Sequence, residues 1–194
     1  MEFVESYMKF GFDDEYFYRI EKSSVLSNTE YVKPCEFIIL QDSKLCFIEA
    51  KSSAPKPATK KNFDKFIGEI VQKFEDSILL YNAVKMKRHG EEVSSEIPLN
   101  LNTVNEDIRY RLYLVIHGHK SEWMPPIQDE LRNRLRHILN AWNIKDIDVQ
   151  AINHDDARDK GLIKDFFPTD ELCRLKNKST EEKQTIAENW LMNR

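Results

Sequence analysis

Short apolar runs near the start of the chain predict strands. Residues 16–26 are rich in aromatic and β-branched residues, and residues 35–41 and 45–52 form two further apolar runs. A tight turn at 42–44 separates the last two runs. Apolar runs of this length, bounded by turn residues, are typical of strands. We therefore expect three consecutive strands, of which the last two form a hairpin.

Two longer segments have the periodicity of helices. Between residues 62 and 86, apolar side chains recur at steps of three and four, which indicates a helix with one buried face. A Pro-Pro pair opens a second helix at about 126–141. Ser179 and Glu182 have the spacing of a capping box, which predicts a C-terminal helix that ends at about residue 193.

The remaining segments complete an alternating pattern of strands and helices. They are expected to be a short helix at 2–10, a loop at 53–61, polar loops at 89–107, and strands at 110–117 and 146–152. Strands interleaved with long helices predict an α/β or α+β fold, with a mixed central sheet flanked by helices. We expect one domain over residues 1–194, with a core at about 1–120 and a C-terminal α/β extension at about 121–194.

Composition and charge narrow the function. The net charge of −4 excludes a uniformly basic protein that coats nucleic acid, although a local basic patch is still allowed. Only five glycines are present, too few for a glycine-rich phosphate loop. The three cysteines have no metal-like spacing and fit a reducing compartment, so we expect a cytoplasmic protein. The sequence has neither a secretory signal pattern nor the ~20 apolar residues of a membrane helix, so we expect no membrane partner.

Charged residues interrupt the apolar strands at matching points. Glu49 and Lys51 are two residues apart, so their side chains leave the same face of their strand. Glu36 lies at the edge of the preceding strand. If the chain turns at 42–44, paired residue numbers sum to about 85, and Glu36 lies opposite Glu49.

Two opposed carboxylates repel each other, and a bound divalent cation would remove that repulsion. Mg²⁺ and similar cations take oxygen ligands, so Glu36 and Glu49 are candidate metal ligands, and the carbonyl of Ala50 is a further candidate. The ammonium of Lys51 beside such a metal would stabilise charge on a phosphate in the transition state or orient an attacking water. Taken alone, the Glu-Ala-Lys sequence is also compatible with the solvent-exposed end of an ordinary strand.

This arrangement resembles the PD-(D/E)XK nuclease superfamily, whose fold is restriction-endonuclease-like. The matching residues are Pro34-Cys35-Glu36, a gap of twelve residues, and Glu49-Ala50-Lys51. The expected element order is similar to the family's αβββαβ core over roughly residues 1–120, here followed by a C-terminal helical extension. Two features differ: Glu36 replaces the usual Asp and comes one residue later, and the Gln-x-x-x-Tyr of the RecB-like branch is absent.

The resemblance implies a metal-dependent hydrolase that cleaves phosphodiester bonds in nucleic acid, DNA more often than RNA, with Mg²⁺ or Mn²⁺ as cofactor. It implies metal ligands at Glu36 and Glu49, a catalytic lysine at Lys51, and possible homodimers. Many members use a further acid from the first helix or strand. Glu21 is our candidate for that acid, and Glu5 and Glu15 are alternatives.

Lysines gather directly after the expected site. The basic and polar residues that we expect to contact a phosphate backbone are Ser52, Lys56, Lys60, Lys61, Lys65 and Lys73. Lysines beside such a site give sequence-independent, salt-sensitive binding, whereas in another protein they would simply be a solvated loop. We interpret His117 and His119 as structural, because no third ligand has a clear spacing, and Trp123 as a packing residue.

Three hypotheses remain open from the sequence. The first is a Mg²⁺- or Mn²⁺-dependent nuclease. The second is a catalytically inactive nuclease-fold module for nucleic-acid binding or protein assembly. The third is an unrelated α+β interaction domain in which the Glu-Ala-Lys sequence is accidental. Only the first needs a carboxylate-lined cation site.

Overall fold

The protein has a mixed five-stranded sheet as its centre. The computed structural model describes the whole chain apart from the side chain of Asn28. The sheet has the order β3-β4-β5-β6-β7. Its strands are β3 (Phe17–Tyr18), β4 (Phe37–Gln41), β5 (Lys44–Lys51), β6 (Arg109–Ile116) and β7 (Val149–Asn153). Strands β3 to β5 are antiparallel, whereas β5, β6 and β7 run parallel, which makes the sheet mixed.

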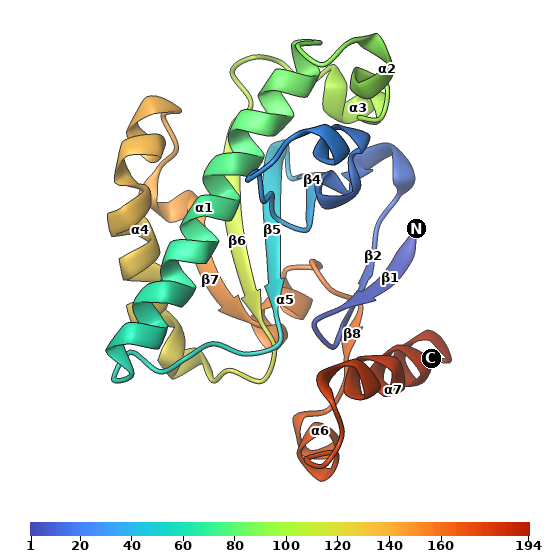
Figure 1. Cartoon of the computed structure of the whole chain (residues 1–194), viewed down its shortest axis with the longest axis vertical. Coiled ribbons are helices and arrows are strands. Elements are labelled where there is room, and N and C mark those ends of the chain that lie inside the picture. Colours follow the sequence, from blue (N-terminus) through green and yellow to red (C-terminus); the bar gives the residue numbers. More distant parts are fainter.

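A second, antiparallel sheet of three strands has the order β1-β2-β8. Its strands are β1 (Glu2–Glu5), β2 (Met8–Gly11) and β8 (Asp165–Phe166). The α-helices are α1 (Lys60–Lys85), α2 (Glu91–Ser94), α3 (Leu99–Asn102), α4 (Met124–Ala141), α5 (His154–Asp159), α6 (Thr169–Arg174) and α7 (Thr180–Met192). In Figure 1, α1 and α4 cover one face of the central sheet, and the small sheet lies on the other side.

The two faces of the central sheet are buried in separate cores. On β5, Leu45 and Phe47 pack in the core beneath α1 and α4, and Cys46 and Ile48 pack in the core beneath the small sheet. This alternation follows from the two-residue period of a strand. It also fixes the direction of Glu49 and Lys51, which continue the odd-numbered series and face α1.

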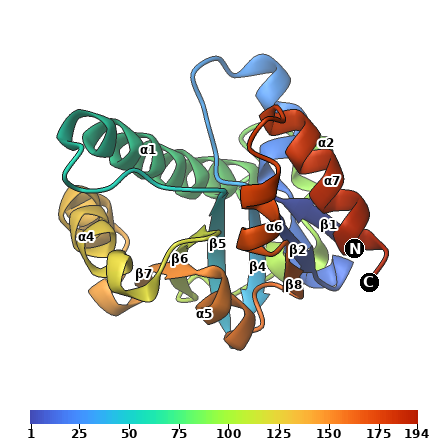
Figure 2. The same ribbon diagram turned by 90° about the horizontal axis from the view of Figure 1, so that it is seen from below.

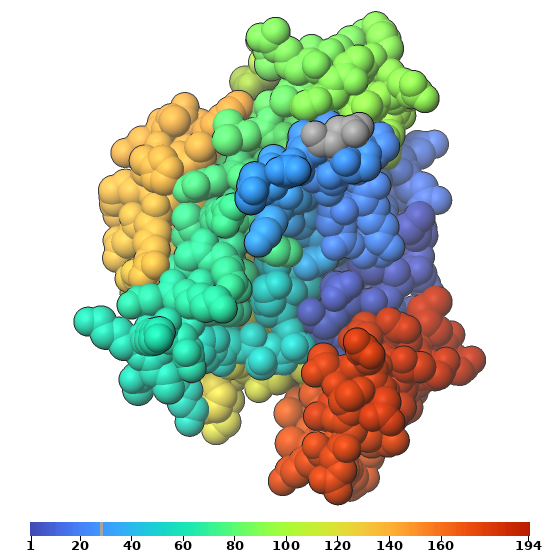
Figure 3. All heavy atoms as spheres, in the orientation of Figure 1, coloured from blue at the N-terminus to red at the C-terminus, as the bar shows by residue number. Residues whose placement is uncertain are grey.

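The C-terminal helices attach to the small sheet rather than to the central one. Leu191 and Ala187 of α7 pack with Tyr7 and Phe167 in a third, smaller core. Figure 3 shows α6 and α7 as a separate lobe beside the hairpin of β1 and β2. Figure 2 shows α6 and α7 on one side of β5 and β6, with α1 and α4 on the other side.

The general expectation of a mixed sheet flanked by helices is confirmed, but the first element of the expected αβββαβ core is wrong. Residues 2–10 form the β1–β2 hairpin instead of a helix. Ser6 and Tyr7 form its two-residue turn, and both have positive φ angles, of 51° and 66°. Such turns usually contain Asn or Gly, so the sequence lacks the normal signal for this hairpin. Stacking of Phe3 and Phe10, with a ring-centroid distance of 5.4 Å, helps to hold the two strands together.

The expected strand at 16–26 is mostly replaced by 3₁₀ turns. Only Phe17 and Tyr18 pair with β4, and turns at Ile20–Lys22 and Ser24–Asn28 follow. Polar side chains explain the early end of the strand, because Ser23 donates a hydrogen bond of 2.8 Å to Glu96. Serine side chains that bind in this way compete with regular strand pairing.

The later elements agree well with their predictions. The 62–86 helix is α1, the 126–141 helix is α4, and the 110–117 strand is β6. The expected capping box is present, because the Ser179 side chain accepts from Glu182 N and the Glu182 side chain accepts from Ser179 N. The loops at 89–107 contain the short helices α2 and α3. Within the described residues, the helices include none with an apolar stretch long enough to span a bilayer.

Candidate functional site

The site lies where the edge of β5 is no longer paired with β4. The β4–β5 pairs sum to 85, as expected, from Gln41 with Lys44 to Phe37 with Ile48. The N–H of Glu36 then donates to the carbonyl of Ile48 at 3.1 Å. Two residues further along β5, the carbonyl of Ala50 accepts a hydrogen bond of 3.2 Å from Ser6 Oγ. The Ala50 carbonyl is therefore at an open sheet edge, where it is held by a side chain from the β1–β2 turn.

The register brings Glu36 and Glu49 together on the face that α1 covers. The side chain of Glu49 is fully buried, and that of Glu36 is 9% exposed. Burial of two carboxylates in one place is costly unless cations or hydrogen bonds compensate them. The residues around these two side chains therefore decide what the site can hold.

Lys73 of α1 provides the first compensating charge. Its Nζ lies 3.3 Å from Glu36 Oε1 and 3.0 Å from Glu49 Oε2. Burial alone would lower the pKa of Lys73, but the carboxylates of Glu49 and Glu36 raise it well above its usual range. The phase of α1 thus directs Lys73 into the site, while Gln72 is exposed and lies near Tyr31. The ammonium of Lys73 marks a position for a cation between the two carboxylates.

Lys51 provides the second compensating charge. Its Nζ lies 2.5 Å from Glu49 Oε1, and its side chain is 28% exposed, so Lys51 connects the buried carboxylate to solvent. Lys73 Nζ is 2.9 Å from the same oxygen. Glu49 Oε1 therefore lies between two ammonium groups, which compensate its buried charge.

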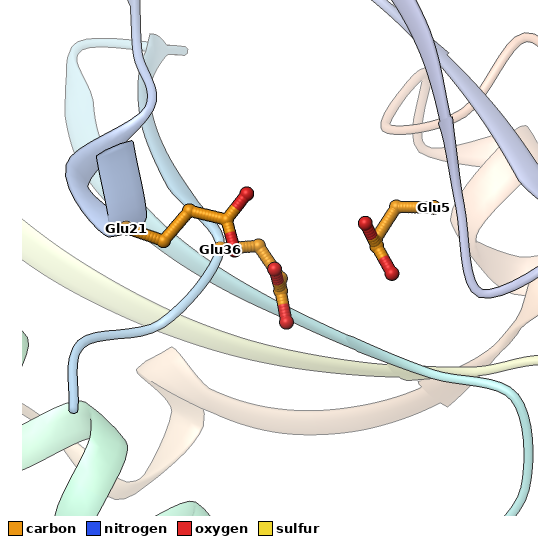
Figure 4. Close-up of side chains that lie close together, drawn as sticks. All are labelled: Glu5, Glu21 and Glu36. Carbon is orange, nitrogen blue, oxygen red and sulfur yellow. The ribbon is translucent and has the colours of Figure 1, made fainter.

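Two further acids join Glu36 on its other side. Carboxylate oxygens of Glu5, Glu21 and Glu36 lie within 4.8 Å of one another. Figure 4 shows Glu21 and Glu36 adjacent to each other, with Glu5 reaching the same space from the opposite side. Glu5 ends β1, and Glu21 lies in the 3₁₀ turn at Ile20–Lys22. Three separate elements therefore converge on one group of carboxylates.

Arg19 partly neutralises this group. Its guanidinium forms an ion pair with Glu21 and lies 4.0 Å from Glu5. The site thus has four carboxylates (Glu5, Glu21, Glu36 and Glu49) against three cationic side chains (Arg19, Lys51 and Lys73). If all four acids were ionised, one negative charge would be left without a partner among these residues.

The crowding of these carboxylates shifts their pKa values. Burial, together with the nearby carboxylates of Glu21 and Glu49, raises the pKa of Glu36 to about 9. Burial also raises the pKa of Glu5, and the charge of Glu21 adds to this effect. Burial alone would raise the pKa of Glu21, but hydrogen bonds from Glu36 and Arg19 lower it below its usual value. Glu36 therefore carries the proton and Glu21 the charge, which is how closely spaced acids share a site.

The chemistry of these residues fits a divalent cation. Several carboxylate oxygens and one backbone carbonyl form the oxygen-rich environment that Mg²⁺ and Mn²⁺ prefer. The four acids and three cationic side chains balance only while Glu36 keeps its proton, and a bound cation would take the place of that proton. Glu5, Glu21 and Glu36 would hold it most directly, because Lys73 already fills the space between Glu36 and Glu49.

The residues expected to contact nucleic acid are more dispersed. Ser52 lines a hollow between the β1–β2 turn and α7, next to Glu5. Lys56, Lys60 and Lys61 are exposed on the loop after β5 and at the start of α1. Lys65 is 79% exposed and lies 3.8 Å from Glu69. Lys73 is only 23% exposed, because its side chain is directed into the carboxylate pair.

Several features of the site were not apparent in the sequence. Arg19 and Ser6 were not expected, and no pattern in the chain marks them. Of the alternatives to Glu21, Glu5 joins the group, whereas Glu15 is exposed and lies 3.4 Å from Asn100. Glu5 reaches the site only because residues 2–10 form a hairpin. We expected a helix there, so the sequence did not predict this role of Glu5.

A histidine lies beneath the site in a structural role. His117 is 1% exposed, and its Nε2 lies 2.6 Å from the carbonyl oxygen of Phe167. Burial lowers the pKa of His117 to about 4, so the ring is neutral near pH 7. The ring of His154 packs against it with a centroid distance of 5.1 Å. His117 therefore links the central sheet to the segment that leads into α6.

No protein-family model, no curated protein and no solved structure matches the chain. The functional argument therefore rests on the geometry and charge of the site.

Proposed function

We propose that the protein is a divalent-metal-dependent nuclease that hydrolyses phosphodiester bonds in nucleic acid. We also propose that its central sheet, with α1 and α4, corresponds to a restriction-endonuclease-like core whose first helix is replaced by the β1–β2 hairpin. One observation carries the proposal. The carboxylates of Glu5, Glu21 and Glu36 gather beside the buried Glu49, which pairs with the half-buried Lys51 at the end of β5.

Each residue has a distinct role in this proposal. Glu36, Glu21 and Glu5 hold the cation, and Ala50 offers an oxygen at the same edge. The cation, Mg²⁺ or Mn²⁺, withdraws charge from the phosphate and makes a bound water more acidic. Glu49 would become a ligand as well only if Lys73 moved away, because Lys73 now occupies the space between Glu36 and Glu49.

Lys51 acts on the substrate. Its ammonium is held by Glu49 and partly faces solvent, so it can approach a phosphate oxygen without losing its position. During hydrolysis a water oxygen forms a new bond to phosphorus while the bond to one ester oxygen breaks. Negative charge accumulates on the phosphate oxygens and on the leaving oxygen, and a fixed ammonium stabilises that charge.

The surface beside the site suits a nucleic-acid partner, and we favour DNA over RNA on the family resemblance alone. Lys56, Lys60 and Lys61 follow the site along the chain, and residues 51–61 contain no acid. A homodimer remains a proposal on the same resemblance.

Cleavage assays with matched variants test the proposal. The native chain is incubated with single-stranded, duplex and branched DNA and RNA, in Mg²⁺ or Mn²⁺, beside Lys51→Ala and Glu36→Gln. We expect native cleavage and a loss of at least about 100-fold in both variants, because each removes charge stabilisation of the transition state. The matched control is Glu15→Gln, which changes an exposed acid outside the group and should cleave normally.

Cleavage that persists in Lys51→Ala and Glu36→Gln would mean that a contaminant or another site is responsible. Absence of cleavage in the native chain with every substrate would refute the proposal. Circular dichroism of each variant separates loss of function from loss of fold.

One observation favours a second function, that of a catalytically inactive nuclease-fold module. The ammonium of Lys73 lies between Glu36 and Glu49 and neutralises them without a metal. In that case the native chain would bind nucleic acid but not Mn²⁺. The Lys73→Met variant would then gain Mn²⁺ binding, because it removes the competing charge, and calorimetry measures this directly.

A further inference from the structure

The loops that follow β5 and β6 leave the central sheet at the same end, where both strands finish. The two strands are parallel and in register, with Lys51 opposite Ile116. Lys51 ends β5, so the loop at 52–59 and the turn after β6 both begin beside the proposed site. Figure 2 shows these two loops next to each other at the starts of α1 and α4.

An indole and two ammonium groups meet where these loops approach. Trp123 lies in a 3₁₀ turn that leads directly into α4. Lys56, from the loop after β5, has its Nζ 5.7 Å from the ring centroid of Trp123. Lys120, from the loop after β6, has its Nζ 5.5 Å from the same centroid. Both distances are within the range of cation–π attraction.

The indole is held in place from within the protein. His119 is only 9% exposed and packs edge-on against Trp123, with a ring-centroid distance of 5.3 Å. Asn153 at the end of β7 donates a hydrogen bond of 2.9 Å to Ser121, two residues before the indole. Trp123 itself is half-buried, whereas Lys56 and Lys120 are exposed. The ring is therefore fixed, and the two ammonium groups beside it are exposed, although that of Lys120 also lies 3.8 Å from the exposed carboxylate of Glu122.

A rigid aromatic ring flanked by lysines is suited to an unpaired nucleotide. A base stacks on an aromatic side chain whatever its sequence, and lysines contact the phosphates on either side. Bases inside a duplex are already stacked on one another and do not offer their faces to a protein. The chemistry of this surface therefore favours single-stranded nucleic acid over fully paired duplex.

We propose that Trp123, with Lys56 and Lys120, is a subsite that stacks one unpaired base of the substrate and binds its adjacent phosphates. This inference rests on the proposed nuclease function, and it specifies the substrate as a single strand or an unpaired segment. The lysines that now lie near the indole would turn to the phosphates when the base takes their place. Trp123 thus has a binding role beyond packing.

Binding without metal tests the subsite separately from catalysis. The full chain, in EDTA, is titrated into a labelled 15-nucleotide DNA strand, the RNA of the same sequence, and the blunt DNA duplex. We expect tighter binding to the single strands and a loss of about tenfold or more in Trp123→Ala, because one stacked base contributes roughly that much. Trp123→Phe, which keeps an aromatic ring, should retain most of the affinity. Lys56→Gln with Lys120→Gln should weaken binding and reduce its dependence on salt.

Trp142 provides the matched control, because it lies at the other end of α4 and is 37% exposed. The Trp142→Ala variant should bind single strands as the native chain does. Equal affinity for strand and duplex, no binding to any of the three, or equal affinities of Trp123→Ala and Trp142→Ala would each overturn the inference. Metal-dependent cleavage of duplex by Trp123→Ala would leave the nuclease proposal intact while this subsite failed.

Discussion

The two ends of the central sheet each bury carboxylates among cationic side chains, but only one end crowds several acids together. At the end where β6 begins, Asp148 is 1% exposed, and both of its oxygens have partners. Arg109 lies 2.5 Å from Oδ2, and Arg111 donates to Oδ1 at 3.0 Å through two nitrogens. At the other end, the acids outnumber the cationic side chains, and burial beside Glu21 and Glu49 raises the pKa of Glu36 to about 9.

This difference separates a structural ion pair from a functional site. The Asp148 group is complete, so it needs no ligand and has no free capacity to bind one. The acids around Glu36 balance their cationic neighbours only while Glu36 keeps its proton, and a bound cation could take the place of that proton. Active sites often keep such unfavourable arrangements at a cost in stability.

The largest effect should come from removing the carboxylate of Asp148. The Asp148→Ala variant leaves Arg111, which is 17% exposed, without its partner. Removal of one member of a buried ion pair typically costs about 3–5 kcal/mol, so the free energy of unfolding should fall by roughly this amount. Urea denaturation measures the change, and Mn²⁺ binding of the folded variant should be unaltered. A loss below about 1 kcal/mol would mean that this group is not the structural support described above.

A smaller effect should appear with pH at the site end, through His117. Burial lowers its pKa from 6.5 to about 4, so between these values the unfolded chain binds a proton that the folded chain does not. His117 therefore costs no stability above about pH 6.5, and destabilises the fold increasingly as the pH falls to 4, by about 3 kcal/mol in total. The measurement is urea denaturation of the native chain and of His117→Gln at several pH values. If the free energy of unfolding changed equally with pH in the two proteins, His117 would not be the source of this effect.

The smallest effect should have the opposite sign. The raised pKa of Glu36 means that its ionisation above pH 4.5 is unfavourable in the folded state. Glu36→Gln keeps the shape of the side chain and removes that cost, so the metal-free variant should be more stable than the native chain at pH 7, by at most about 3 kcal/mol and by less if the amide loses its contact with Lys73. Thermal unfolding in EDTA compares the two. Destabilisation as large as that of Asp148→Ala would place Glu36 among the structural residues.

The sequence predicted this site in part, for identifiable reasons. The opposition of Glu36 and Glu49 followed from the short turn at Asp42 and Ser43, because a hairpin register depends only on local geometry. That Lys51 shares a face with Glu49 followed from the two-residue period of a strand. The contacts between these residues and α1 could not be predicted in this way, because nothing in the local sequence pattern fixes which residue of α1 reaches the sheet.

The N-terminal region was the hardest to predict. The Ser6-Tyr7 turn has no Gly or Asn, and a short segment with mixed apolar and charged residues also suits a helix. Packing of Phe3, Phe10 and Phe37 against one another decides in favour of the hairpin, and these contacts span distant parts of the chain. The same tertiary packing brings Glu5 and Ser6 to the site.

The central claim is that the surplus of acids at the open edge of β5 holds a divalent cation, and calorimetric titration with Mn²⁺ tests it most directly. The native chain, Glu36→Gln and the control Glu15→Gln are titrated at the same pH. The account predicts that the native chain and Glu15→Gln bind Mn²⁺ alike, and that Glu36→Gln binds at least about tenfold more weakly because a ligand charge is lost. No Mn²⁺ binding by the native chain, or equal binding by Glu36→Gln, would contradict it.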